Sequence, residues 1–155
     1  MEEEQAYFPL YVNLKNRKIL VVGGGSIAER RILSLLDFGG SITVEAPGVT
    51  PGIAGLAGEG RLAWRCREYK ETSLEGMELV LAATDRPEVN RAVYEACKKR
   101  HIPVNCADDK ELCDFYFPAL VQGAGLVIGV SSSGKDHAKV RRIAEKLRRW
   151  LEGQQ

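Results

Sequence analysis

A short apolar run that ends in three glycines constrains the fold of this chain more than any other feature. The run covers 18–22, is rich in β-branched residues, and leads directly into Gly23-Gly24-Gly25. Apolar residues over 26–38 then recur at helical spacing, and Gly39-Gly40 provides a stop signal. A buried strand, a glycine turn and a helix in this order are typical of a βαβ unit with parallel strands.

The same alternation continues as far as residue 113. Further strands are predicted over 41–46, 62–67, 78–83 and 102–106, with helices over 53–60 and 87–100 between them. Parallel neighbours need crossover connections, so this order predicts a Rossmann-type, doubly wound parallel sheet. We expect residues 1–113 to form this α/β domain.

The pattern changes after residue 113. Apolar runs over 115–120 and 125–131 are separated by a short glycine-containing segment, a spacing that predicts a small antiparallel hairpin. Residues 137–151 carry apolar side chains on one stripe and Lys and Arg on another, which predicts a basic amphipathic helix. Residues 114–155 are therefore expected to form a separate extension that ends in a C-terminal helix.

Composition excludes several classes of protein. Lys and Arg number 22 against 21 Asp and Glu, so the chain has no overall charge that would favour nucleic acid. Its apolar runs are shorter than the roughly 18 residues of a membrane span, and its acidic start differs from a signal peptide. We expect a soluble, cytoplasmic protein. The four Cys and two His residues lack zinc-site spacing, so no metal site is predicted.

The glycine turn has the form GxGxxA at the junction of a strand and a helix, the context that a dinucleotide fingerprint requires. Gly23 permits the tight turn and Gly25 lets the backbone approach a pyrophosphate, while free N–H groups at the helix start attract phosphate. A turn that is merely glycine-rich is the alternative. We predict an NAD site whose contacts include Gly23, Gly24, Gly25, Ser26 and Ile27.

Glu45 ends the second predicted strand, about twenty residues beyond the turn, where an acidic side chain meets the ribose hydroxyls in such folds. A carboxylate there would repel a 2′-phosphate, and no Arg stands immediately beside it. NAD is therefore favoured over NADP. The alternative is that Glu45 is only a solvent-exposed side chain.

Three more residues are predicted to face the cofactor crevice, because ligands of an open α/β sheet lie outside the carboxyl ends of its strands. Thr84 and Asp85 follow the fourth strand, and Asn105 lies near the end of the fifth. Thr84 and Asp85 could equally cap the helix that begins near Pro87.

Several further short segments, spread over nearly the whole chain, are informative as a set. They are 8–14, 21–25 with 28–30, 82–85, Asn90, 104–105, Asp108, 117–118 and 130–134. Together they resemble the bifunctional precorrin-2 dehydrogenase/sirohydrochlorin ferrochelatase family, the NAD-dependent part of siroheme synthase. The resemblance implies that precorrin-2 loses two hydrogens to give sirohydrochlorin, with hydride passing to NAD. Many members of the family also insert ferrous iron, which is then a co-substrate.

Asp108 matches the family's catalytic acid/base by its place after the fifth strand. The chemistry agrees, because hydride loss from the macrocycle also requires a proton acceptor, and metal insertion requires removal of pyrrole N–H protons. On the residues alone, Asp-Asp-Lys after a strand is common turn chemistry. Asp109 and Asp114 are expected to be structural, with assistance to the base as the alternative role for either.

A tetrapyrrole that carries many carboxylates calls for a site with donors and cations. The candidates are Arg30, Ser131, Ser132 and Lys135, with Arg31, Arg141 and Arg142 as further cations. The alternatives are a solvated helical face for the basic residues and a capping loop for the serines.

Family members pair through the segment that follows the Rossmann unit, so the resemblance implies a homodimer. Residues 114–155 would be its dimerisation extension and a truncated C-terminal helical segment. Two other functions stay open at this point. One is a non-catalytic NAD-sensing or regulatory Rossmann domain, since the fold occurs without chemistry. The other is a chelatase that has lost the oxidation.

Overall fold

The chain divides into two units in the computed structural model, which describes residues 7–154. The larger unit covers Leu10–Phe115, and the smaller combines residues 7–9 with the residues from Tyr116 onward. Sequence reasoning put the boundary after residue 113 and assigned the start of the chain to the larger unit. Each unit has its own sheet.

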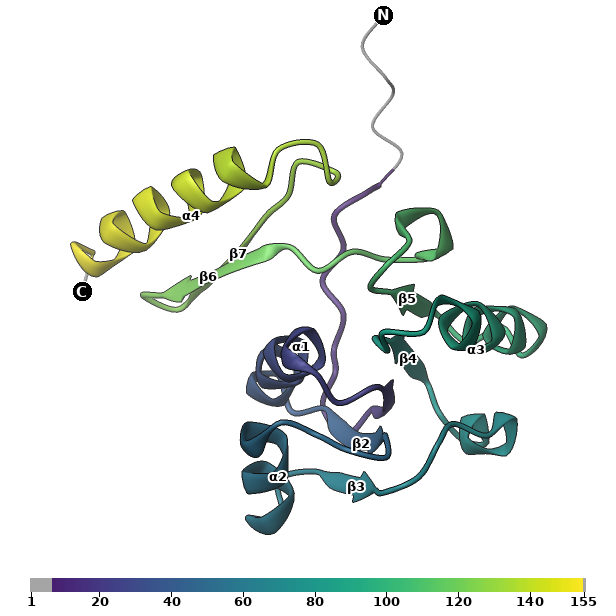
Figure 1. Cartoon of the computed structure of the whole chain (residues 1–155). Helices are drawn as coiled ribbons and strands as arrows, with labels where there is room; N and C mark the ends of the chain where they lie inside the picture. The colour runs from purple at the N-terminus through teal and green to yellow at the C-terminus, as the bar shows by residue number, and fades with distance from the viewer. Residues whose placement is uncertain (1–6, 155) are drawn as a thin grey trace, which may run out of the picture. The chain divides into compact units, whose positions relative to one another are not determined.

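The larger unit is built on a five-stranded sheet. Its strands are β1 (Lys18–Val22), β2 (Ser41–Glu45), β3 (Ala63–Arg65), β4 (Leu79–Ala82) and β5 (Val104–Cys106). Their order is β3-β2-β1-β4-β5 and every pair of neighbours is parallel (Figure 1). The chain runs outward from β1 to one edge and then crosses back to β4, so the order reverses beside β1. The predicted doubly wound topology is confirmed.

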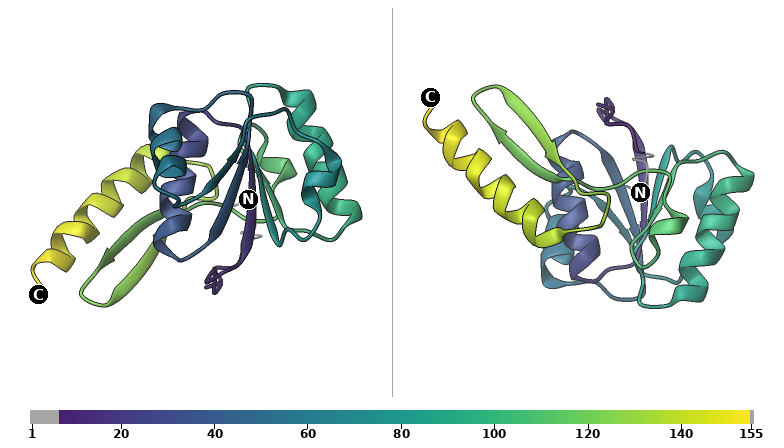
Figure 2. Two further views of the ribbon diagram at one scale, coloured as in Figure 1. Left: turned by 90° about the horizontal axis from the view of Figure 1, so that it is seen from below. Right: turned by 90° about the horizontal axis from the view of Figure 1, so that it is seen from above.

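Helices cover both faces of this sheet. They are α1 (Ser26–Asp37), α2 (Pro51–Gly58) and α3 (Pro87–Lys99). Figure 2 shows α1 and α2 on one face and α3 on the other. Two 3-10 turns, η1 (Glu71–Leu74) and η2 (Lys110–Leu112), lie in connections where no element was predicted. Segments of one turn are too short to carry a recognisable periodicity.

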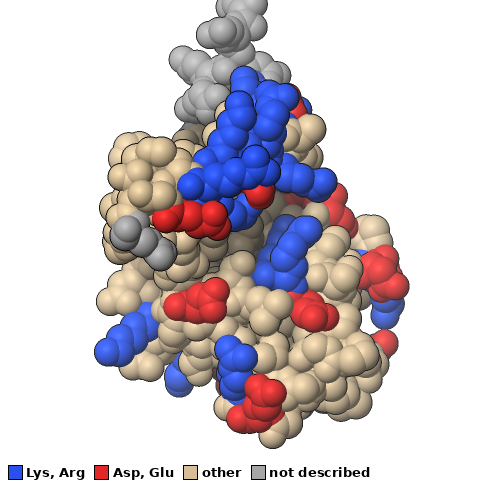
Figure 3. Space-filling view, turned by 90° about the vertical axis from the view of Figure 1, so that its left-hand side faces the viewer, with Lys and Arg blue, Asp and Glu red and all other residues tan. Residues whose placement is uncertain are grey.

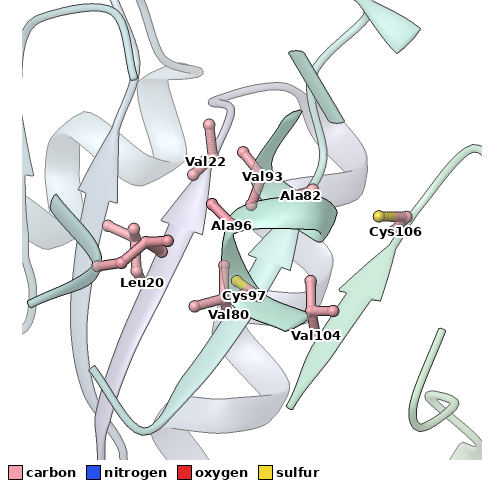
Figure 4. Close-up of a cluster of buried hydrophobic side chains, with 10 residues drawn as sticks. Leu20, Val22, Val80, Ala82, Val93, Ala96, Cys97, Val104 and Cys106 are labelled. Carbon is pink, nitrogen blue, oxygen red and sulfur yellow. The ribbon is translucent and has the colours of Figure 1, made fainter. Parts of the chain in front are cut away.

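The central strands are apolar throughout because they are buried on both faces. In β1 every residue after Lys18 is buried. Leu20 and Val22 point to the α3 face, where they pack with side chains of β4, β5 and α3 (Figure 4). This core contains Val80, Ala82, Val93, Ala96, Cys97, Val104 and Cys106.

The smaller unit is a hairpin with one helix. β6 (Ala119–Gly123) and β7 (Leu126–Val130) pair antiparallel, and α4 (His137–Glu152) packs on them around Val121, Ala144 and Leu151. The predicted hairpin and helix are confirmed. Ala124 and Gly125 form the turn with φ of 48° and 76°, the left-handed backbone that a two-residue hairpin favours.

Basic side chains collect on α4. Six of its sixteen residues are Lys or Arg and two are Glu. All six basic residues are exposed, and Figure 3 shows Lys and Arg gathered on the side of the molecule that faces the viewer there. Their exposure agrees with the amphipathic pattern of the sequence.

No helix among the described residues is long and apolar enough to cross a membrane.

Candidate functional site

The glycine turn joins β1 to α1, and its first two glycines are required by the protein's own packing. Gly23 has φ +118°, and a Cβ placed on it would lie 2.6 Å from the carbonyl carbon of Ala83. A Cβ on Gly24 would lie 2.7 Å from Cγ1 of Val49. Real Cβ atoms do not approach so closely, so no other residue fits at these positions without movement of the neighbouring loops.

Gly25 differs, because a Cβ built on it would meet nothing within 4 Å. It is the N-cap residue of α1 and has no side chain to accept a hydrogen bond from the first turn. The first N–H groups of a helix have no intrahelical partner, so they are available to an anion here. Ser26 is exposed beside them, and Ile27 is 45% exposed. The turn therefore fits the diphosphate and an adjacent apolar part of a dinucleotide.

Parallel pairing brings three strand ends to the same edge of the sheet. The N–H of Ala83 donates to Val22 O at 2.8 Å, and the N–H of Ala107 donates to Ala82 O at 2.9 Å. The segments that follow β1, β4 and β5 are thereby linked in turn. Thr84 and Asp108, predicted separately from the sequence, follow neighbouring strands at this edge.

Thr84 is tied to α3 through Asn90. Its hydroxyl donates to Oδ1 of Asn90 at 2.7 Å, and Nδ2 of Asn90 returns a hydrogen bond to the Thr84 carbonyl at 3.1 Å. Asn90 is only 1% exposed, so the half-buried Thr84 is held from the interior side. Asp85 is exposed and does not cap α3, whose N-cap is Arg86 without a side-chain bond. Asp85 was predicted either to contact the cofactor or to cap this helix, and the capping role is wrong.

Asn105 is 2% exposed, and its amide is fully engaged. Nδ2 donates to the carbonyl of Phe115 at 2.7 Å, and Oδ1 accepts from Nη1 of Arg31. Burial lowers the pKa of the Arg31 guanidinium, and Cys113 is the largest influence that raises it. Asn105 therefore positions Arg31 at this edge, and Arg31 brings a partly desolvated positive charge there.

Asp108, Asp109 and Asp114 have different surroundings. Asp108 is exposed, and its carboxylate makes neither a hydrogen bond nor an ion pair with any of residues 7–154. Asp109 accepts from Glu111 N at 3.0 Å and caps η2. Asp114 accepts from Val104 N at 3.1 Å and pairs with Lys98 at 2.7 Å. Asp109 and Asp114 are occupied by structural contacts, as expected, whereas Asp108 is available.

Glu45 is buried, with its side chain 0% exposed. Oγ of Ser73 lies 2.6 and 2.8 Å from its two oxygens, and Lys70 N donates at 3.1 Å. Arg67 donates from Nη2 at 3.2 Å, and Nη1 of Arg65 lies 3.8 Å away. The prediction that no Arg stands beside Glu45 was therefore wrong, as was the alternative of an exposed side chain. Both oxygens of the Glu45 carboxylate are thus engaged by groups of the protein itself.

The remaining candidates belong to loops and exposed faces. Arg30 is exposed on α1. In the smaller unit Oγ of Ser131 accepts from Ser133 N at 3.1 Å, and Oγ of Ser132 accepts from Asp136 N at 2.9 Å. The serines thus organise the loop before α4, and Lys135 is exposed on that loop. Among the described residues no group of three or more His, Cys, Asp or Glu could hold a metal ion.

Sequence reasoning missed the partners that come from distant parts of the chain. Arg67 and Ser73 lie beyond β3, and the sequence contains no sign that their side chains return to Glu45. Asn90 was noted only as a position of the family resemblance. Its burial could have been predicted, because it is a polar residue on the helix face that also carries Val93 and Cys97. A buried amide at such a place has to find partners.

This chain resembles known proteins both in its sequence and in its structure. Residues 10–119 match the family described as "Putative NAD(P)-binding". The solved structure of SirC, a precorrin-2 dehydrogenase, matches with a TM-score of 0.78 and 31% identity, over 91% of this chain and 69% of that one. This chain belongs to the precorrin-2 dehydrogenase family. The family resemblance predicted from the sequence is confirmed.

Curated relatives of the family are longer proteins. Siroheme synthase 3 of Aeromonas hydrophila is 39% identical over 145 residues, which are 94% of this chain and 31% of that protein. The probable multifunctional siroheme biosynthesis protein HemA of Ruminiclostridium josui is 40% identical over 92% of this chain and 28% of its own length. The chain thus spans about a third of the curated relatives that it matches.

Proposed function

We propose that this chain catalyses the NAD-dependent oxidation of precorrin-2 to sirohydrochlorin, a step of siroheme biosynthesis. The observation that carries the proposal is the exposed carboxylate of Asp108, which has no partner among residues 7–154 and follows β5 at the edge where β1 ends in the glycine turn. The names of the relatives support the same reaction. A non-catalytic NAD sensor would not require such a carboxylate, and no relative cited above is named as one.

The chemistry needs a hydride acceptor and a proton acceptor. NAD, when bound, accepts the hydride that the macrocycle loses. Asp108 accepts the proton, and its exposure allows the proton to pass on to water. We assign the cofactor contacts to Gly23, Gly24, Gly25, Ser26, Ile27, Thr84 and Asp85, and the substrate contacts to Arg30, Ser131, Ser132 and Lys135. Asn105, which was predicted as a cofactor contact, acts at this site by positioning Arg31, because its own amide is engaged.

Insertion of ferrous ion into sirohydrochlorin is a second candidate function, favoured by the same residue. Metal insertion releases two pyrrole protons, and the exposed carboxylate of Asp108, which makes no ion pair with any described residue, is available to accept them. Ferrous ion would then be a substrate and not a resident metal.

The test is anaerobic incubation of the protein with precorrin-2 and NAD, followed by NADH absorbance and the macrocycle spectrum. We expect one NADH for each sirohydrochlorin formed. Ferrous ion is added after the oxidation is complete, and a further spectral change beyond the protein-free control reports chelation. Absence of NADH formation by folded protein that binds NAD would contradict the dehydrogenase.

We also propose that the protein is a homodimer that pairs through β6 and β7. A two-stranded sheet is marginal by itself, and in the described chain neither strand has another neighbour. Leu126, at the start of β7, is 48% exposed. Sedimentation at micromolar concentration should give a dimer, and a Leu126→Lys variant should weaken it. A wild-type monomer would contradict the pairing.

A further inference from the structure

Several carboxylates of the described chain form ion pairs, and among these only Glu45 has a side chain that is 0% exposed. The proposed oxidation does not use it. Burial of a charge costs free energy unless partners surround it. Glu45 has such partners, because Ser73, Lys70 N and Arg67 all donate to it. The arrangement concentrates two arginines and one acid at the end of β2.

This cluster lies at the cofactor turn. The N–H of Gly23 donates to the backbone carbonyl of Glu45 at 3.1 Å, so the end of β2 adjoins the start of the glycine turn. In this fold the ribose of the adenosine lies at the end of the second strand. Arg65 is the register partner of Glu45 in β3, and Arg67 follows two residues later. Both guanidinium groups therefore belong to the ribose end of the site.

The two arginines are not enclosed. Their side chains are 43% and 44% exposed, while the Glu45 side chain between them is 0% exposed. An Arg at the end of the second strand normally favours NADP, because it pairs with the 2′-phosphate. Here Arg67 directs both Nε and Nη2 to the Glu45 carboxylate at 3.3 and 3.2 Å. The edge of the Arg67 guanidinium that carries Nε and Nη2 is therefore occupied by Glu45.

We propose that Glu45 selects NAD over NADP through these arginines: its buried charge holds Arg67 inward and offsets the charge of Arg65, so neither pairs fully with a 2′-phosphate. This inference rests on the proposed NAD site at the glycine turn. Glu45 is thus a positioning residue that never contacts the cofactor. A carboxylate with a purely structural role would leave the preference between the two cofactors unchanged when it is replaced.

The test is calorimetric titration of folded variants with NAD and with NADP. Glu45→Gln keeps the shape of the side chain but removes its charge, so both arginines become available. We expect NADP affinity to rise by about tenfold or more relative to NAD affinity. Glu59→Gln is the matched control, because Glu59 is an exposed acid beside Arg61 at the end of α2. Its ratio of affinities should equal that of the wild type.

A second variant tests the proposal even if Glu45→Gln does not fold. Removal of one partner from a buried ion pair is destabilising, whereas replacement of both partners is often neutral. Glu45→Gln/Arg67→Met removes both and leaves Arg65 without its acid. The relative gain in NADP affinity should persist and be smaller than in the single variant.

The outcomes separate this inference from the proposed function. A wild-type ratio in either folded variant overturns the role of Glu45, even when NAD binds normally. A wild-type protein that binds neither cofactor overturns the proposed NAD site itself. Circular dichroism of each variant establishes beforehand that it is folded.

Discussion

Nη1 of Arg31 donates a hydrogen bond to Oδ1 of Asn105, and this bond joins α1 to β5 although the residues are 74 positions apart. Asn105 also donates to the Phe115 carbonyl at 2.7 Å. One buried amide therefore links the helix that begins at the glycine turn to the strand that precedes Asp108. The link is an anchor for the edge of the sheet where both proposed ligands bind.

Removal of this amide should destabilise the fold. In Asn105→Ala the carbonyl of Phe115 and the partly buried Arg31 guanidinium each lose a partner, so we expect the free energy of unfolding to fall by about 1–3 kcal/mol. Urea denaturation measures it. Asn13→Ala is the control, because Asn13 is exposed and accepts only a local bond from Lys15 N. Equal stability of the two variants would mean that the hydrogen bonds of Asn105 contribute nothing measurable to the free energy of unfolding.

Two glycines of the turn should respond differently to the same substitution. Gly25→Val places its side chain in open space, so the protein should fold and lose NAD affinity by at least about 100-fold as the pyrophosphate is blocked. Gly23→Val meets the Ala83 backbone at φ +118° and should lower thermal stability before any ligand is added. Thermal melts and calorimetry separate the effects. Normal NAD binding by Gly25→Val would exclude the turn as the phosphate site.

Buried thiols predict a loss of stability at alkaline pH. Burial raises the pKa of Cys97 and of Cys106 from 9.0 to about 12. In the unfolded chain these thiols ionise near pH 9, whereas the folded chain retains their protons. The folded state therefore binds more protons between pH 9 and about 12, and the free energy of unfolding falls as pH rises through that window. Below pH 9 these groups contribute no pH dependence.

Urea denaturation below and within this window measures the slope. Cys97→Ala should make it shallower, since one of the buried thiols that contribute to it is removed. Cys66→Ala should leave it unchanged, because Cys66 is exposed. A slope that is the same in all three proteins would show that the buried thiols ionise as freely in the folded state as in the unfolded state.

The sequence predicted the strands best where helices cover both faces of the sheet. β1 was predicted residue for residue, because a central strand covered on both faces is apolar from end to end. The edge strands β3 and β5 are shorter than the predicted 62–67 and 102–106. The last pair of β3 is Arg65 with Glu45, where β2 ends, so residues 66–67 have no strand beside them. β5 begins only after Pro103, which has no backbone N–H to donate to a neighbouring strand.

The candidate site was predictable in its positions and less so in its contacts. The glycine turn, Thr84 and Asp108 were located because each follows a strand whose end is visible in the sequence. The environment of Glu45 was not, since it depends on Arg67 and Ser73, which return from 22 and 28 residues further along the chain. Side-chain partners at such separations are set by packing, which no local pattern encodes.

The rate of NADH formation by Asp108→Asn, compared with the wild type and Asp109→Asn, tests the account most directly. Asn keeps the volume of Asp108 but does not accept a proton at neutral pH, so we expect unchanged folding and NAD affinity with a loss of about 10²- to 10⁴-fold in turnover. Asp109→Asn should stay close to wild type, because Asn also caps η2 in place of the side chain that accepts from Glu111 N. Full activity of Asp108→Asn, or a larger loss in Asp109→Asn, would contradict the assignment of Asp108 as the base.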